Sequence, residues 1–285
     1  MLMKKIMMLA SLLIINSCGA ADSGEIQWRQ LELQNTILMT LPQGKVVVEL
    51  TPQFSPNHVA RFKTLAQEDF YQNTSFYRVI EGFVAQAGPK DGSDKDKSIT
   101  KLAIEDQWTT NKSFSFTPVQ QQDLFAEQTG FKDGFAIGYS AKEQKAWLTH
   151  CPGTLAMARE TGKDTATSHF YFSIGQAPRY LDRNMTIFGR VVYGMEHIQS
   201  IKRTSTIEGE FAVDSRDHTK IIDIQLMSEL PKAQQLIIEV EDTGSEGFAK
   251  RLVKTRHRDN DFFYHKPPPV LDVCQIVVRS RLGEI

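Results

Sequence analysis

The sequence is poor in cysteine, balanced in charge and, beyond its N-terminal segment, free of long apolar runs. It has 3 cysteines in 285 residues, and 33 Lys and Arg against 34 Asp and Glu leave a net charge of −1. This balance argues against nucleic acid as the main partner. The His-Glu spacing of zinc enzymes, the phosphate loop and the Gly-x-Ser-x-Gly elbow are also missing. The sequence therefore gives no sign of the common zinc, nucleotide or serine-nucleophile sites.

The N-terminal segment has the pattern of a targeting signal. Two lysines precede an apolar run over residues 6–15, which is too short for a bilayer that needs about twenty residues. The run leads to a small residue and Cys18, which resembles the cleavage box of bacterial lipoproteins, where the cysteine is acylated and becomes N-terminal. We expect a lipoprotein-type signal over residues 1–18, a lipid on Cys18 and a tether over residues 19–32.

The destination of the exported chain has an alternative. Asn16 is not the residue that such boxes favour, so ordinary secretion with cleavage nearby stays open. Gly19 and Ala20 lack the acidic signal for inner-membrane retention, which favours the outer membrane. We therefore expect a protein on the periplasmic side, held to the membrane only through its lipid.

Export changes the interpretation of the other two cysteines. With Cys18 acylated, Cys151 and Cys274 form an even pair in an oxidising compartment. We expect one disulfide that staples the C-terminal extension to the main domain. Two unrelated buried thiols are the alternative.

The apolar periodicity predicts a domain of short strands with two helices. One helix begins at Ser55-Pro56, with the serine as cap and Val59 and Phe62 in a core-facing stripe. The second follows Gly194. The expected strands cover residues 36–41, 45–50, 75–80, 153–158, 169–174, 186–192 and 221–226. Many strands with few helices indicate a closed β-barrel capped at its ends, here over residues 33–230.

Two further segments exceed what a barrel requires. Residues 90–145 are expected to be an insertion with little regular structure. Residues 231–285 are expected to form a small α+β extension docked on the barrel, because about fifty residues bury only a marginal core alone. Its predicted elements are a strand over 236–240, a helix over 245–258 and a strand over 273–278.

The most informative stretch runs from residue 76 to residue 88. It distributes Arg78, Phe83 and Gln86 over a strand, a turn and the start of a second strand. We expect the three side chains to converge on one patch of a sheet. A fixed positive charge, an apolar wall and a carboxamide suit a site that binds and polarises a peptide bond beside an apolar ring.

This stretch resembles the signature of cyclophilin-type peptidyl-prolyl isomerases. A second block, residues 153–159 with 168–192, resembles the other half of their site, and a helix after Gly194 follows in the right order. The likeness is to the bacterial exported branch, although the insertion and the extension exceed the usual small domain. It implies a mainly β, cyclophilin-like antiparallel barrel.

The resemblance also implies roles for individual residues. Arg78 matches the catalytic arginine, and Gln86 matches a residue that hydrogen-bonds the substrate backbone. Ala158 and Arg159 match a segment whose backbone pairs with the peptide, and His169 takes the place of a frequent glutamine as a hydrogen-bonding residue at the rim. The proline pocket is implied at Phe83, Val84, Tyr171, Leu181 and Met185, with Tyr180 at its rim.

Some of these positions depart from the family pattern. Val84 replaces a frequent methionine and Met185 a frequent histidine, so the pocket stays apolar. Tyr180 replaces the tryptophan that eukaryotic members use to hold cyclosporin, and we expect weak drug binding. Arg159 adds a second positive charge near the groove.

The resemblance implies an isomerase that acts on X-Pro bonds of unfolded or partly folded exported polypeptides. It implies a monomer that needs neither cofactor nor metal. The alternative is a chaperone-like module that binds peptides in the groove with little turnover, because the insertion or the extension covers it.

Overall fold

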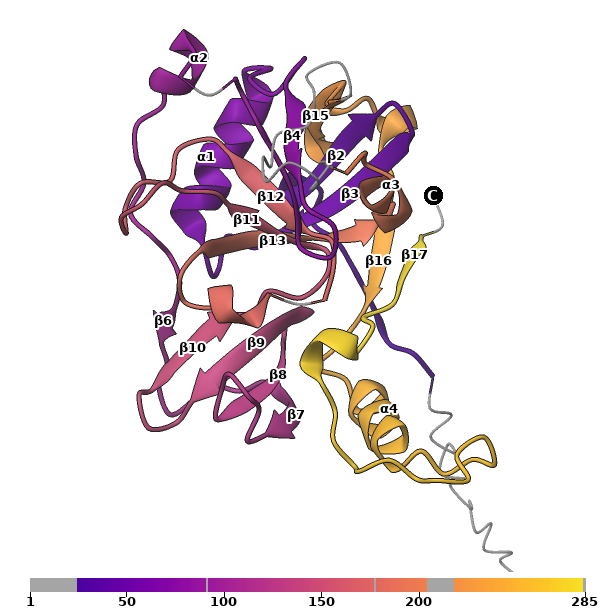
Figure 1. The fold of residues 1–285 in the computed structure, drawn as a ribbon. Coiled ribbons are helices and arrows are strands. Elements are labelled where there is room, and N and C mark those ends of the chain that lie inside the picture. Colours follow the sequence, from indigo (N-terminus) through magenta and orange to yellow (C-terminus); the bar gives the residue numbers. More distant parts are fainter. Residues whose placement is uncertain (1–24, 91, 177, 204–217, 284–285) are drawn as a thin grey trace, which may run out of the picture.

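The computed structural model describes residues 25–90, 92–176, 178–203 and 218–283 (Figure 1). The predicted signal segment and Cys18 lie outside these residues. Among the described helices, none combines the length and the apolar character needed to cross a bilayer.

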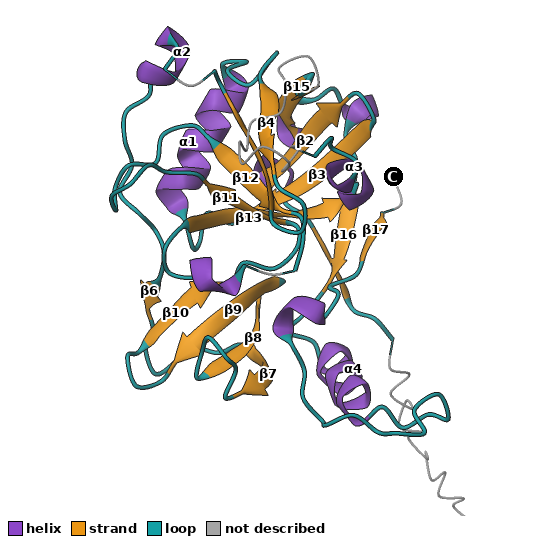
Figure 2. Ribbon diagram, in the orientation of Figure 1, coloured by secondary structure: helices purple, strands orange, loops and turns teal. Residues whose placement is uncertain are grey.

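A curled antiparallel sheet of nine strands forms the main domain (Figures 1 and 2). Its strand order is β14-β4-β5-β12-β11-β13-β3-β2-β15. The strands are β2 (Thr36–Leu41), β3 (Gly44–Leu50), β4 (Ser75–Val79), β5 (Val84–Gly88), β11 (Thr154–Met157), β12 (Phe170–Ser173), β13 (Thr186–Tyr193), β14 (Thr219–Lys220) and β15 (Asp223–Leu226).

The two ends of this sheet meet at one short segment of chain. β14 and β15 are the outermost strands, and only two residues separate them. Of these, the Ile221 N–H donates to the Thr74 carbonyl (2.9 Å) and the Ile222 N–H to the Thr40 carbonyl (3.0 Å), which links the β4 side to the β2 side. The predicted mainly β, cyclophilin-like architecture is confirmed.

Two helices pack on this sheet, as predicted. α1 (Pro56–Gln67) buries Val59 and Phe62 in the barrel core, and α3 (Met195–Gln199) packs on β3. Ser55 stands at the predicted N-cap position, but its side chain does not cap the helix: the hydroxyl donates to the Ile187 carbonyl (2.6 Å) and accepts from none of the helix N–H groups.

The insertion is not the irregular segment predicted from the sequence. After α2 (Asp94–Lys97) it forms a five-stranded sheet of order β6-β10-β9-β8-β7. Glycines in the strands hid the pattern, and packing explains them. A Cβ on Gly138 would lie 2.5 Å from the Trp147 ring, and one on Gly130 2.3 Å from the Thr117 carbonyl. The strands are β6 (Trp108–Thr109), β7 (Thr117–Gln121), β8 (Gln128–Lys132), β9 (Phe135–Ser140) and β10 (Lys145–Leu148).

Both chain ends contribute to a third sheet of three strands. β16 (Ile238–Glu241) lies between β1 (Trp28–Gln30) and β17 (Ser280–Leu282). The predicted tether is therefore wrong over β1, where the Arg281 guanidinium covers the Trp28 ring at 4.4 Å. The predicted strand over 273–278 is also wrong, because Val273–Gln275 is a 3-10 turn capped by the Asp272 side chain. The predicted helix is present as α4 (Glu246–His257).

The extension packs on both the barrel and the insertion. Ile238 and Val240 of β16 pack on Val47 of the barrel, while Phe248 of α4 packs on Phe131 of the insertion. A second link is ionic: the buried Glu49 carboxylate of β3 accepts from Arg29 of β1 (2.6 Å) and from Arg190 of β13 (2.7 Å). N-terminal strand, insertion and extension thus form one lobe beside the barrel.

The structure contains the predicted disulfide between Cys151 and Cys274, 123 residues apart in sequence. Cys151 lies just before β11 of the barrel, and Cys274 lies in the 3-10 turn of the extension. The bond therefore ties the lobe to the barrel.

Replacing both cysteines with serine is expected to lower the free energy of unfolding by about 2–4 kcal/mol, because the unfolded chain regains the entropy of a long loop. Urea denaturation of the oxidised protein and of the double variant measures the difference. Reductant should destabilise the wild type and leave the variant unchanged. Equal stabilities of the oxidised protein and the variant would show that the bond adds nothing.

Candidate active site

Arg78, Gln86 and Tyr171 lie in one row across three neighbouring strands. Arg78 of β4 is opposite Gln86 of β5, which is opposite Tyr171 of β12. Directly opposed residues of antiparallel strands share a face. The row therefore lies on the outer face, while the neighbours Phe170 and Phe172 enter the barrel core, as predicted.

A β-bulge gives Arg78 this orientation. Phe76 is opposite Ala87 and Arg78 is opposite Gln86, so Tyr77 is the extra residue of β4. In a regular strand Phe76 and Arg78 would share a face. The bulge lets Phe76 stay fully buried in the core while Arg78 points outward.

An apolar patch lies beside the row. Its buried members are Tyr171 and Val84, each 3% exposed, and half-buried Phe83, Ala158 and Met185 pack against them. At its edge, the half-buried Leu181 and the 64% exposed Tyr180 belong to the turn Arg179–Leu181. The Tyr180 ring is nearly parallel to the Phe83 ring, with centroids 6.4 Å apart.

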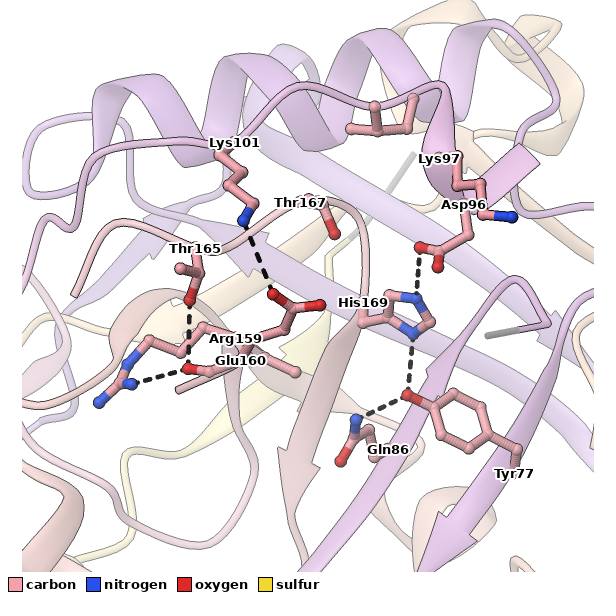
Figure 3. A pocket seen from close by; sticks show the side chains of 12 residues that line it. Tyr77, Gln86, Asp96, Lys97, Lys101, Arg159, Glu160, Thr165, Thr167 and His169 are labelled. Carbon is pink, nitrogen blue, oxygen red and sulfur yellow. Dashed lines mark hydrogen bonds and ion pairs between the residues drawn. The ribbon is translucent and has the colours of Figure 1, made fainter. Parts of the chain in front are cut away.

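A chain of hydrogen bonds leads from Arg78 to an acidic side chain, and Figure 3 shows its part from Gln86 to Asp96. Arg78 Nη1 donates to Gln86 Oε1 (3.1 Å), and Gln86 Nε2 donates to the Tyr77 hydroxyl (2.6 Å). The Tyr77 hydroxyl lies 2.8 Å from His169 Nδ1, and His169 Nε2 lies 2.9 Å from Asp96 Oδ1. His169 thus hydrogen-bonds Tyr77 and Asp96 and lines the cavity described below.

With a neutral His169 ring, the donors and acceptors of this chain fit one arrangement. The Asp96 carboxylate can only accept, so the ring proton lies on Nε2. His169 Nδ1 then accepts from the Tyr77 hydroxyl, whose oxygen accepts from the Gln86 amide. The Gln86 carbonyl oxygen is thereby turned toward Arg78.

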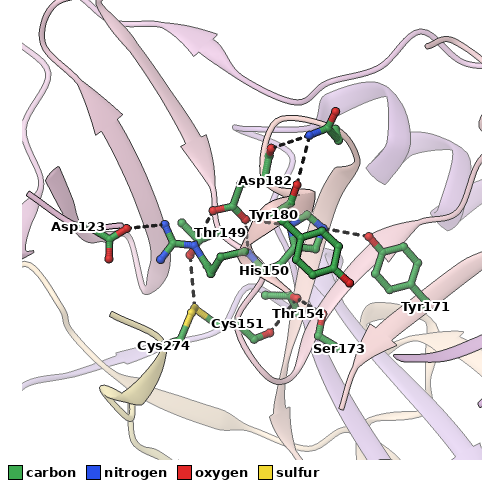
Figure 4. A network of polar contacts seen from close by, with 12 residues as sticks. Asp123, Thr149, His150, Cys151, Thr154, Tyr171, Ser173, Tyr180, Asp182 and Cys274 are labelled. Atoms are coloured by element: carbon green, nitrogen blue, oxygen red, sulfur yellow. Dashed lines mark hydrogen bonds and ion pairs between the residues drawn. A yellow bond between two sulfur atoms is a disulfide. The ribbon is translucent and has the colours of Figure 1, made fainter. Parts of the chain in front are cut away.

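A second, buried network of polar contacts holds Tyr171 of the apolar patch (Figure 4). His150 Nε2 lies 2.9 Å from the Tyr171 hydroxyl, and His150 Nδ1 lies 3.0 Å from Asp182 Oδ1. Asp182 also accepts from Arg179 (2.5 Å), which in turn reaches Asp123 of the insertion (3.1 Å). The network gives the phenol of Tyr171 a partner in an otherwise apolar site. Burial, together with the nearby Asp182 charge, raises the pKa of Tyr171, so its hydroxyl keeps its proton.

The folded insertion also packs against the apolar patch. Phe135, Ile137 and Leu148 form one apolar cluster with Val84 and Tyr171 of the barrel. The insertion therefore extends the outer face that carries the row.

A cavity of about 470 Å³ adjoins the row on the side of α2 (Figure 3). Gln86, Ala158 and His169 form one wall. Arg159 also lines it, and its Nε donates to the Asn184 carbonyl (2.9 Å). Across the described parts of the chain, no group of three or more His, Cys, Asp or Glu is placed to hold a metal ion.

The structure brings the predicted site residues together on one side of the barrel, but it adds residues that the sequence did not reveal. Tyr77 was missed because regular strand alternation would place its side chain on the face opposite to that of Arg78. The bulge is what brings the Tyr77 hydroxyl to Gln86. His150 was missed as well. Its partners Asp182 and Tyr171 are 32 and 21 residues away, and no spacing rule links them.

Comparisons with known proteins agree with this geometry. Residues 36–226 match the family model for cyclophilin type peptidyl-prolyl cis-trans isomerases. A probable peptidyl-prolyl cis-trans isomerase of Brucella suis biovar 1 is 31% identical over 175 residues, which cover 61% of this chain and 75% of the relative. The corresponding protein of Brucella abortus (strain 2308) is 30% identical over the same shares.

A solved structure extends the likeness in fold. The crystal structure of the cyclophilin AquaCyp293 from Hirschia baltica superposes with a TM-score of 0.71 at 24% identity, covering 90% of this chain and 93% of that one. The shared fold thus reaches beyond residues 36–226. With the Arg78–Gln86–Tyr171 row on its barrel, the chain belongs to the cyclophilin-type peptidyl-prolyl cis-trans isomerases.

Proposed function

We propose that this isomerase accelerates rotation about X-Pro bonds of exported polypeptides, with Arg78 acting on the prolyl nitrogen. The observation that carries the proposal is the row of Arg78, Gln86 and Tyr171 beside the apolar patch. It puts a cation, an amide and a ring-sized apolar surface within reach of one dipeptide.

The chemistry requires only that the amide lose its double-bond character. Rotation about a peptide bond has a barrier of about 18–20 kcal/mol, because the nitrogen lone pair is delocalised into the carbonyl. X-Pro bonds populate both isomers and exchange over tens of seconds or more without a catalyst. A hydrogen bond from the Arg78 guanidinium to the prolyl nitrogen holds the lone pair on nitrogen, and the bond then turns more freely.

The remaining groups hold the substrate while the bond turns. The proline ring packs on Tyr171, Phe83 and Met185, and the carbonyl before it swings. Gln86 hydrogen-bonds the peptide backbone. Donors fixed before the reaction stabilise the transition state at no cost in reorganisation, so the order of the Gln86–Tyr77–His169 chain contributes to the rate.

Two features of the sequence and structure support an exported substrate. The N-terminal segment has the pattern of a lipoprotein signal ending at Cys18. The Cys151–Cys274 disulfide fits an oxidising compartment. The bacterial periplasm is such a compartment, and we propose that the lipid on Cys18 holds the protein to the periplasmic side of the outer membrane. Its substrates would then be unfolded or partly folded polypeptides that reach this space.

Arg78→Ala is expected to lower kcat/KM at least about tenfold, because it removes a hydrogen bond made in the transition state. A protease-coupled assay on proline tetrapeptides measures the loss, and circular dichroism checks the fold. Arg281→Ala, on the exposed β17, is the matched control and should keep full activity. Near-normal turnover in folded Arg78→Ala would refute the role of this arginine. Tight peptide binding with little turnover in the wild type would instead favour a chaperone-like module.

Tyr77→Phe is expected to lower kcat/KM about three- to tenfold, because the Gln86 amide loses the acceptor that sets its orientation. The variant keeps the ring, so the bulge and the core should persist. Tyr193→Phe, a half-exposed tyrosine at the end of β13, is the matched control. Equal activity of Tyr77→Phe and Tyr193→Phe would mean that the chain does not position Gln86.

Cys18→Ser is expected to move the protein from the membrane fraction to the soluble periplasm, since the acyl chains provide the anchor. Fractionation with antibody detection, alongside a Cys151→Ser/Cys274→Ser control that keeps Cys18, measures the shift. A wild type already found in the soluble fraction would contradict lipidation and favour ordinary secretion.

A further inference from the structure

A loop beyond α4 exposes large aromatic side chains to solvent. In this segment, residues 259–270 and here named the aromatic loop, Phe262 is 83% exposed and Tyr264 is 89% exposed. Phe263 turns inward, and its ring contacts Phe262 edge to face at 5.0 Å. An ion pair between Lys266 and Asp259 (2.5 Å) joins the two arms of the loop. Adjacent exposed aromatics of this size point to a contact surface.

The aromatic loop and α4 carry excess positive charge. Residues 245–270 contain six Lys and Arg against three Asp and Glu, while the whole chain has a net charge of −1. Lys250 and Lys254 are exposed and lie one helical turn apart on α4, whose other face buries Phe248 and Leu252. Basic and aromatic side chains side by side are typical of surfaces that rest on a membrane interface.

The N-terminal end of the described chain lies against this same region. Ile26 lines a depression together with Lys250, Lys254 and Phe263. The Glu25 carbonyl is close enough to Gly247 of α4 that a Cβ there would lie 3.0 Å from it. Six residues lie between Cys18 and Glu25, and the seven extended steps from one to the other span at most about 25 Å. A lipid on Cys18 would therefore hold α4 and the aromatic loop close to the bilayer.

We propose that the aromatic loop and the basic face of α4 form a membrane-contact surface that binds bilayers containing anionic phospholipid. Phe262 and Tyr264 enter the headgroup region, and Lys250 and Lys254 lie over the phosphates. The choice of a membrane as partner rests on the proposed lipid anchor, because acyl chains on Cys18 would bring this surface within reach of the bilayer. Anionic lipid attracts each lysine near the surface.

The surface would also orient the enzyme. In Figure 1, α2, whose Asp96 lines the cavity beside Gln86, lies at the opposite end of the molecule from the aromatic loop. A bilayer beneath the loop would leave α2 and its side of the cavity at the far end of the molecule, within reach of soluble polypeptides.

A tryptophan reporter tests the surface independently of the anchor. In the full chain carrying Cys18→Ser, Phe262→Trp is titrated with vesicles of phosphatidylethanolamine and phosphatidylglycerol. We expect a blue shift of its emission and quenching by brominated acyl chains, with partitioning at least about fivefold weaker on phosphatidylcholine vesicles or in high salt. The matched control is Ile222→Trp, which is half-exposed on the barrel between β14 and β15.

Two results would overturn the proposal. One is a Phe262→Trp signal that vesicles change no more than that of Ile222→Trp. The other is equal vesicle partitioning of the Cys18→Ser chain with and without the double substitution Phe262→Ser/Tyr264→Ser. This second result covers the case in which the loop binds an unfolded polypeptide instead of a membrane. The vesicle titration uses a chain without Cys18, so its outcome does not depend on the lipid, and a failed anchor and a failed surface give different results.

Discussion

The active site depends on one irregularity in a strand, the β-bulge at Tyr77. Strand β4 has to supply Phe76 to the barrel core and Arg78 to the outer face, although residues two apart in a regular strand share a face. The extra residue resolves this conflict. It also turns Tyr77 toward Gln86, so that the residue displaced by the bulge becomes the one that orients the amide beside the arginine.

Much of the remaining structure holds this face in place. The His150–Asp182–Arg179 network fixes the ring of Tyr171 from below, and Asp123 connects it to the insertion. The insertion packs on the same face, and the extension is bound to it by an apolar cluster and to the barrel by a disulfide. Segments distant in sequence thus form one lobe that packs against the apolar part of the site.

The sequence predicts what local pattern encodes. Arg78, Phe83 and Gln86 lie within nine residues, and their strands carry ordinary alternation, so both the barrel and the core of the site could be inferred. The disulfide followed from an even number of cysteines in an exported chain. Phe170 and Phe172 were assigned to the core from alternation alone.

Features that depend on tertiary packing could not be predicted in this way. Tyr77 reaches Gln86 only because of the bulge, which leaves no mark in composition. His150 and Asp182 meet through the fold. The strands of the insertion contain Gly130 and Gly138, which lower the strand signal, and the reason for them is a ring or a carbonyl that lies against each one. β1 takes its place only because β16, some two hundred residues later, pairs with it.

The central claim is that the groove turns over X-Pro bonds rather than merely holding them. Exchange NMR on an Ala-Pro peptide tests this with the unmodified protein, because it observes both isomers at equilibrium. The account predicts cis–trans exchange peaks at substoichiometric protein, on a timescale far shorter than the tens of seconds of the uncatalysed reaction. Shifted or broadened peptide signals without exchange peaks would show binding without catalysis and contradict it.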